Sequence, residues 1–283
     1  MHTLCFFSLK PAPTGSLKLN EEEIHVRNCI GKEAEGVFYI TVTKATAIKF
    51  SFPSYVTIAR CDLVSEKYVA QETLSKGSYH QLTALTSYYF KISPDAAHAS
   101  AGFAGSITFE DITALSVFHA MGNANYNFKG LSIDVNDLIK LSLVSKLYLP
   151  AGLNGIGRDT ILDLTAFENI THLYLGQNEA DDCLYSVELT DRQMEQIKEY
   201  HVRAQYVPSN IWHLKNADWI YLYGFPSWRD VPYLSSPNEF QVGSSAHNLR
   251  IEATYRDYAV AEQFRSVYGS DRAVTYRSEI NFQ

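Results

Sequence analysis

The sequence predicts a mixed fold, in which an N-terminal all-β sandwich precedes a C-terminal α/β array of parallel strands. Between residues 24 and 115, β-branched and aromatic runs recur at roughly ten-residue spacing with turn residues between them, which is typical of a sandwich. From residue 130 onwards, strand-like runs alternate with helix-like segments. Three of those runs share an apolar–tyrosine–apolar triplet, at 147–149, 173–175 and 220–222.

The composition of the chain limits which classes of protein it can belong to. The 283 residues are 46% hydrophobic and 19% charged, which predicts a globular chain with room for two ordinary cores. The net charge is −7 and the chain has no cluster of Lys and Arg, so nucleic acid is not expected as the main partner. No apolar run reaches the 18 residues of a membrane-spanning helix, so membrane insertion is not expected either.

The N-terminus shows no export signal, and the cysteines show no pattern of a disulfide-rich or zinc-binding protein. The apolar patch Leu4–Phe7 is too short for the core of a signal peptide, so no export signal is visible. The four cysteines are scattered and form no C-x-x-C pair, which predicts neither a disulfide framework nor a zinc site. A single disulfide between Cys29 and Cys61 stays open.

The first 115 residues divide into an arm and a sandwich. Residues 1–23 are expected to form an extended arm, because Pro11, Pro13 and Gly15 prevent regular structure over most of it. The sandwich is expected over 24–115, with strands at 36–43, 47–52, 56–59, 87–92 and 105–109. Residues 112–121 fit either one helix or a pair of strands. A linker is expected over 116–129, where Gly122 to Asn127 are turn residues.

The end of the predicted sandwich resembles a known class of accessory domain. The order Leu85–Ile92 followed by Gly105–Phe109 is similar to the closing strands of pre-peptidase C-terminal and other jelly-roll accessory domains. The resemblance covers about 25 residues and is one of pattern. It implies a binding or accessory role for this part of the chain.

In the C-terminal part, short strands and helices are expected in alternation. Strands are expected at 131–133, 147–149, 173–175, 187, 220–222, 249–251 and 274–276. Asp137 is a plausible cap for a short helix that ends near Leu143. The run Thr190–Gln193 fits a capping box, and the helix it opens is expected to continue through Ile197 and Tyr200. Another helix is expected at about 257–267.

Residues 130–283 resemble a degenerate leucine-rich-repeat domain. Ile170, Leu173, Leu175 and Asn178 follow the L-x-x-L-x-L-x-x-N spacing of that family. The resemblance implies a solenoid whose parallel strands line one face. Residues 217–222 keep the triplet, but Phe225 stands where the family has Asn, so this copy lacks the residue that forms the family's tight turn after the strand. An ordinary α/β sheet stays open as the alternative.

The best candidate for a binding surface is the outward face of these strands. Alternation along a strand buries the aliphatic residues of each triplet and turns the tyrosine outward. An aromatic row of this kind suits a protein partner or a sugar ring. The alternatives are stacking that only stabilises the sheet, or burial under another part of the protein. The candidate face consists of Lys146, Tyr148, His172, Tyr174, Trp219, Tyr221 and Tyr223.

Other candidate sites lack the spacing that their chemistry requires. The loop Gly152–Gly157 has the order G-x-x-G-x-G, which is not that of a phosphate-binding loop. The acidic residues Glu179, Asp181 and Asp182 lack the pattern of a calcium loop. Nothing local marks Cys183 as a nucleophile paired with a histidine. The sequence therefore predicts no catalytic residues, no metal and no cofactor.

Together these features predict a non-enzymatic structural or binding component of a larger assembly. A phage-virion-like or bacterial surface protein is favoured, located on a virion or on an extracellular surface. The expected partners are proteins, either neighbours in the assembly or further copies of this chain, and a glycan is a second option. Two alternatives stay open: a free-standing protein- or glycan-binding module, and a hydrolase or hydrolase accessory chain.

Overall fold

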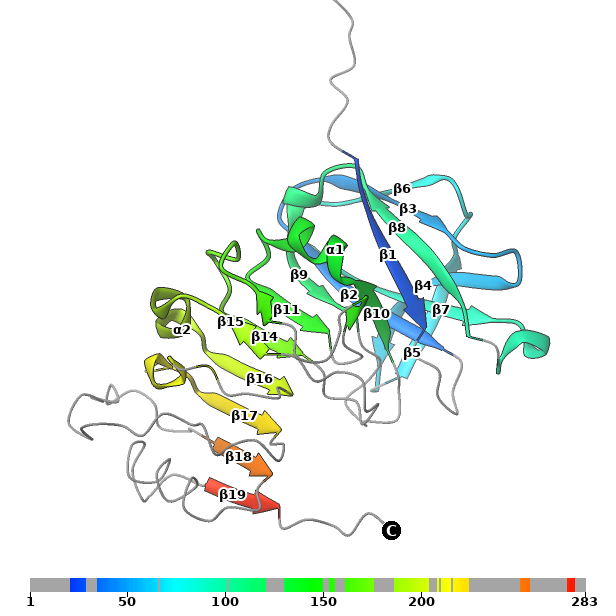
Figure 1. Ribbon diagram of the computed structural model, residues 1–283. Helices are drawn as coiled ribbons and strands as arrows, with labels where there is room; N and C mark the ends of the chain where they lie inside the picture. The colour runs from blue at the N-terminus through cyan, green and yellow to red at the C-terminus, as the bar shows by residue number, and fades with distance from the viewer. Residues whose placement is uncertain are drawn as a thin grey trace, which may run out of the picture.

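The chain is mostly β-strand wherever the structure describes it. The computed structural model describes residues 21–28, 35–65, 67–100, 102–120, 130–149, 153–155, 161–175, 186–203, 208, 210–214, 216–223, 250–254 and 274–277. In these ranges the strands form two large sheets and a separate two-stranded sheet (Figure 1). The β-rich character of the predicted fold is therefore confirmed.

The smaller of the two large sheets has the strand order β12-β10-β1-β8-β3-β6. Its neighbouring strands are antiparallel, except for β10 and β12, which are parallel. Its strands are β1 (Glu22–Asn28), β3 (Thr46–Ser51), β6 (Tyr79–Leu82), β8 (Ala104–Phe109), β10 (Leu131–Asp134) and β12 (Leu153–Asn154).

The larger sheet has the order β19-β18-β17-β16-β14-β11-β9-β2-β7-β4-β5. The strands from β5 to β9 are antiparallel, and those from β9 to β19 are parallel. They are β2 (Gly36–Val42), β4 (Val56–Val64), β5 (Lys67–Thr73), β7 (Thr86–Pro94), β9 (Leu115–His119), β11 (Lys146–Leu149), β14 (His172–Leu175), β16 (Glu199–Arg203), β17 (Trp219–Tyr223), β18 (Arg250–Thr254) and β19 (Val274–Arg277).

The remaining elements are short. β13 (Ile161–Asp163) pairs in parallel with β15 (Ser186–Glu188). The helices are α1 (Val135–Leu138) and α2 (Asp191–Gln196), with 3-10 turns η1 (Ala96–His98), η2 (Ile112–Ala114), η3 (Ile139–Leu141) and η4 (Ile211–His213). Within the described ranges, no helix has the length and apolar character that crossing a membrane requires.

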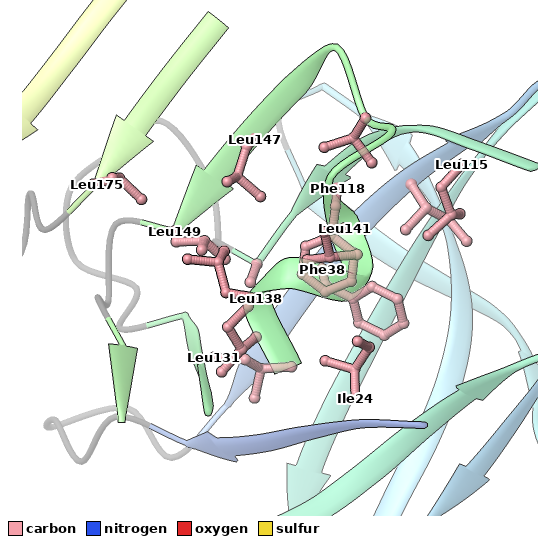
Figure 2. Packing of buried hydrophobic residues seen from close by; sticks show 14 of the residues in the cluster. Ile24, Phe38, Leu115, Phe118, Leu131, Leu138, Leu141, Leu147, Leu149 and Leu175 are labelled. Carbon is pink, nitrogen blue, oxygen red and sulfur yellow. The ribbon is translucent and has the colours of Figure 1, made fainter. Parts of the chain in front are cut away.

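One hydrophobic core runs through both parts of the larger sheet. In β2, Phe38 and Ile40 alternate with less buried residues and face Ile24 of the smaller sheet across the core. The same buried cluster continues into the parallel strands through Leu147 and Leu149. Figure 2 shows these leucines and Phe38 in a single group of packed side chains. Because burial of apolar surface dominates folding energetics, this shared core ties the two parts together.

The boundary expected between two domains lies within the sheets. β9 pairs with β2 on one side and with β11 on the other, so it carries the larger sheet from its antiparallel part into its parallel part. The predicted linker over 116–129 is therefore wrong for residues 116–119, and 121–129 lie outside the described residues. β10, expected in the parallel array, instead pairs with β1 in the smaller sheet.

The helix after residue 190 begins as predicted and ends earlier. Thr190 Oγ1 accepts the Gln193 N–H, and Gln193 Oε1 accepts the Thr190 N–H, which completes the predicted capping box. The helix ends at Gln196 because Ile197 is extended, and the predicted continuation through Tyr200 is wrong. Tyr200 is fully buried and lies in β16, between β14 and β17.

Four smaller points of the sequence analysis also need correction. Asp134, not Asp137, caps α1, because its side chain accepts the Asn136 N–H. β1 begins at Glu22, inside the range expected for the arm, whose residues 1–20 lie outside the described part. Cys61 is a buried free thiol, so the disulfide with Cys29 does not form. The strand expected near 187 is β15, which lies in the separate two-stranded sheet.

Candidate binding face

The register of the parallel strands aligns the predicted residues of the face. Lys146 pairs with His172, and Tyr148 pairs with Tyr174, across β11 and β14. Both leucines that flank Tyr174 are fully buried, whereas Tyr174 itself is half-buried on the opposite face of the sheet. The tyrosines of two of the three triplets are thus direct neighbours, as the repeated triplet predicts.

A strand that the triplet does not identify separates these residues from the third tyrosine. β16 lies between β14 and β17, with Glu199 beside His172 and His201 beside Tyr174. In β17, Trp219 and Tyr221 follow in register with Glu199 and His201. Tyr223 pairs with Arg203, two residues further along both strands. The side chains of Trp219, Tyr221 and Tyr223 lie outside the described part, so only their strand positions are known.

The row of rings also extends in the other direction, into the antiparallel part of the sheet. Tyr148 pairs with His119, His119 with Tyr39, and Tyr39 with Tyr89. These strands lie side by side in Figure 1 from β7 to β16. We call this set the aromatic row, and its members are Tyr89, Tyr39, His119, Tyr148, Tyr174 and His201.

Within the aromatic row, the rings stack against one another. The centroids of Tyr148 and Tyr174 lie 4.6 Å apart, and those of Tyr174 and His201 lie 3.8 Å apart with an interplanar angle of 14°. His119 stacks on Tyr148 at 4.5 Å, and its edge meets Tyr39 at 6.2 Å. Stacking of this kind stabilises neighbouring strands. It also covers the faces of the inner rings and leaves mainly their edges for a ligand.

A second row beside the first carries charge. We call Lys146, His172 and Glu199 the charged row, since they hold matching positions in β11, β14 and β16. Tyr174 Oη donates to Glu199 Oε2 at 2.7 Å, which joins the two rows. His172 Nε2 lies 3.7 Å from Glu199 Oε1. On one face of the sheet, the charged row therefore presents a cation, an imidazole and a carboxylate, and the aromatic row beside it presents phenol edges.

Burial shifts the titration of the histidines on this face. Burial lowers the pKa of His119 to about 4. Burial, and then the neighbouring His172, lower the pKa of His201 to about 3. Burial and the Lys146 charge also lower the pKa of His172, and Glu199 opposes the shift. These imidazoles are therefore neutral at pH 7.

This burial predicts that the fold loses stability in mild acid. The folded state resists protonation of His119 and His201, so the unfolded chain binds more protons once the pH falls below about 6.5. We expect the free energy of unfolding to fall by about 2 to 3 kcal/mol for His119 alone between about pH 6.5 and pH 4. Urea titrations across that range measure the slope. His119→Phe keeps a ring in the stack and should flatten the slope, and an unchanged slope would contradict the assignment.

The sequence pattern could have identified part of what it missed. Glu199-Tyr-His-Val202 repeats the order polar, apolar, ring, apolar that Lys146–Leu149 and His172–Leu175 share. This repeat was not recognised as a strand, because the helix that begins at the capping box was expected to continue through these residues. His119, Tyr39 and Tyr89 lie on strands of the predicted sandwich and linker, and only the shared sheet brings them into the row.

The weaker candidates gain no support as sites. Of the Gly152–Gly157 loop, Leu153 and Asn154 form β12 and Gly155 follows, while the rest lies outside the described part. Glu179, Asp181, Asp182 and Cys183 also lie outside it. Among the residues that are described, no group of three His, Cys, Asp or Glu side chains could hold a metal ion.

No family model matches this chain, and neither the curated proteins nor the solved structures gave a match.

Proposed function

We propose that this chain is a non-enzymatic binding component of a larger assembly and that it meets a protein partner through the aromatic and charged rows. The observation that carries the proposal is the continuous register of the aromatic row across β7, β2, β9, β11, β14 and β16, with the charged row beside it on β11, β14 and β16. The half-buried tyrosine edges of this row offer hydrogen-bonding groups on a rigid base, at low entropic cost of ordering.

The geometry favours a protein partner over a sugar on this face. A sugar ring binds to an aromatic side chain by lying flat on the ring face. In the aromatic row, the neighbours of Tyr148 and Tyr174 cover those faces at centroid distances of 3.8–4.6 Å. The edges that remain are flanked by Lys146 and Glu199, whose opposite charges suit a partner with its own mixed charges.

The strand spacing supports a leucine-rich-repeat-like array as the framework of this face. From β11 to β19, the parallel strands begin at 146, 172, 199, 219, 250 and 274. Their starts are thus separated by 26, 27, 20, 31 and 24 residues. Four of these spacings lie within the period of about 20–29 residues that is typical of the family. We infer that each unit stacks its apolar face on the next, as solenoid repeats do.

Matched charge reversals test the proposed binding face. Lys146→Glu changes the charged row, and Lys67→Glu makes the same change on the exposed strand β5. The immobilised chain first captures candidates from a lysate of its source. Each candidate is then purified and titrated against the wild type and both variants, and sedimentation tests self-association. We expect Lys146→Glu to weaken binding at least about tenfold, and Lys67→Glu to bind like the wild type.

The outcome separates the proposal from its alternatives. Equal binding by the wild type and both variants would show that the charged row is not part of the interface. Retention of polysaccharide instead of protein, with loss in Lys146→Glu, would favour a glycan module. Thermal unfolding of each variant shows whether a loss of binding reflects a loss of fold.

A further inference from the structure

A row of polar side chains, separate from the two rows described above, crosses the outer face of the smaller sheet. Asp134 pairs with Asn154, and Ser106 pairs with His25 on one side and with Ser51 on the other. Asp134 follows Ile133, which pairs with Val26, so Asp134 lies beside His25. We call this set the polar row, and its members are Asn154, Asp134, His25, Ser106 and Ser51.

The polar row lines a pocket of about 510 Å³. Arg27, two residues after His25 on β1, lies along one side of it, and Phe52 and Pro53 follow Ser51 at the end of β3. A volume of this size is within the range of pockets for small molecules, about 300–1,000 Å³. The polar row is the set of convergent hydrogen-bonding groups that distinguishes such sites from plain surface hollows.

Gly105 allows the end of β3 to close in on the start of β8. A Cβ at this position would lie 2.5 Å from the Ser51 carbonyl oxygen and 2.3 Å from Phe52 Cδ1. A Cβ atom cannot lie that close to atoms to which it is not bonded, so any larger residue would push Ser51 and Phe52 away. The close approach brings the Ser51–Pro53 segment, which lines the pocket, against β8.

A buried carboxylate fixes the orientation of His25 in the pocket. Asp137 Oδ2 accepts both the His25 backbone N–H, at 2.6 Å, and a hydrogen bond from His25 Nδ1, at 2.8 Å. Its side chain is only 6% exposed, whereas that of His25 is 61% exposed. Nε2 is thus the ring nitrogen turned away from Asp137, and it lies 3.8 Å from Glu23. Ser106 Oγ donates to the other oxygen of Glu23.

The charges around the pocket are mixed. Arg27 is exposed and forms no ion pair with any described residue, and His25 adds a second group able to carry positive charge. Asp134 and the nearby Glu23 carry negative charge, so neither a phosphate nor a bare cation meets a field of one sign. Hydroxyl, amide, imidazole and carboxylate groups in one row instead match a ligand that both donates and accepts many hydrogen bonds.

We propose that this pocket binds a neutral saccharide residue. The ligand's hydroxyl groups would exchange hydrogen bonds with Asn154, Asp134 and His25, while Phe52 and Pro53 contribute apolar surface. The site lies on the other sheet from the aromatic row, so it is independent of the protein-binding face proposed above. The carboxylate–imidazole pair serves here to position His25.

Two pairs of matched variants test the site. Asn154→Ala removes a polar group of the row, and Gln81→Ala removes an exposed amide from β6 of the same sheet. Ala104→Leu extends an exposed lining residue into the pocket, and Ala70→Leu makes the same change on exposed β5. The probes are glucose, galactose, N-acetylglucosamine and their disaccharides, with inorganic phosphate for comparison. Binding is followed by chemical-shift changes in the ¹⁵N-labelled full chain.

We expect saturable binding of at least one neutral sugar, with shifts at His25 and Asn154. Asn154→Ala and Ala104→Leu should weaken it by about tenfold or more, the effect of losing about 1.4 kcal/mol of contact energy. Gln81→Ala, Ala70→Leu and Lys146→Glu should bind sugar like the wild type. The proposal is overturned if no neutral sugar binds, if phosphate alone binds, or if the two pocket variants bind as well as their controls.

Discussion

Gln193→Ala is expected to lower the free energy of unfolding by about 3 kcal/mol, because this buried side chain holds two segments together. Gln193 Nε2 donates to the carbonyl oxygens of Leu164 and Phe167, at 2.9 and 3.0 Å, and more weakly to that of Thr165. Its Oε1 caps α2 through the Thr190 N–H at 2.7 Å. The side chain therefore fixes the turn after β13 to the start of α2.

Two companion variants separate the contributions of Gln193. Gln193→Glu keeps the oxygen that caps the helix but replaces the donor to three carbonyl groups, so it should be nearly as destabilising as alanine. Gln196→Ala removes a side chain of the same type with two carbonyl partners in a more exposed setting, and should cost about 1 kcal/mol. Urea denaturation measures all three. A loss below about 1 kcal/mol for Gln193→Ala would refute this role.

Asp137→Ala should cost about 2 to 3 kcal/mol, since it leaves the groups around a buried carboxylate without a partner. Asp137 accepts from the His25 backbone and ring, and from Lys140 Nζ at 2.6 Å. These bonds fasten α1 to β1. As a control, Asp62→Ala removes an exposed carboxylate from β4 and should change stability by less than about 0.5 kcal/mol. Equal effects of the two substitutions in urea denaturation would contradict the account.

The contribution of Asp137 should also depend on pH. Burial raises the pKa of its carboxyl group, but the hydrogen bonds from Lys140 and His25 outweigh burial, so the pKa lies below its usual value. The stabilisation is therefore present above the unfolded pKa of about 3.9 and is lost as the pH falls through the folded value. The difference in stability between the wild type and Asp137→Ala should be constant above about pH 4 and should shrink as the pH falls below it. A difference between them that stays constant as the pH falls further below about 4 would contradict this assignment.

Local patterns in the sequence predicted much of the fold. Alternation placed Leu147 and Leu149 in the core and Tyr148 outside it. The capping box placed the start of α2 correctly. These features depend on neighbours within a few residues, where propensity and periodicity act directly.

The missed features depend on contacts that are distant in sequence. The run from Met194 to Tyr200 has apolar residues at helical spacing, but pairing of β16 with strands on both sides prevails over that local preference. The same holds for β9, whose residues fit a helix or strands and become one strand between β2 and β11. No local rule predicts which strands will flank a given segment.

The two proposed binding surfaces differ in how far the sequence could identify them. The repeated triplet located Tyr148 and Tyr174 directly, and their register follows from the repeat. The polar row joins His25, Ser106 and Asn154, which are more than 120 residues apart at the extremes and share no motif. Only the strand order β12-β10-β1-β8-β3 brings them together.

The position of β16 is central to the proposed binding face, because it puts Glu199 and His201 between the predicted tyrosines. Cysteine pairs test it in a chain whose four native cysteines have been replaced. Adjacent strands lie about 4.8 Å apart and alternate strands about twice that, whereas a disulfide needs Cα atoms within about 7 Å.

Oxidation of the pair His172→Cys with Glu199→Cys should give a disulfide, and oxidation of His172→Cys with Trp219→Cys should not. The pair Lys146→Cys with His172→Cys is the positive control, since those residues are neighbours in β11 and β14. A disulfide between positions 172 and 219, with none between 172 and 199, would show that β17 lies directly beside β14. That result would contradict the arrangement of both rows.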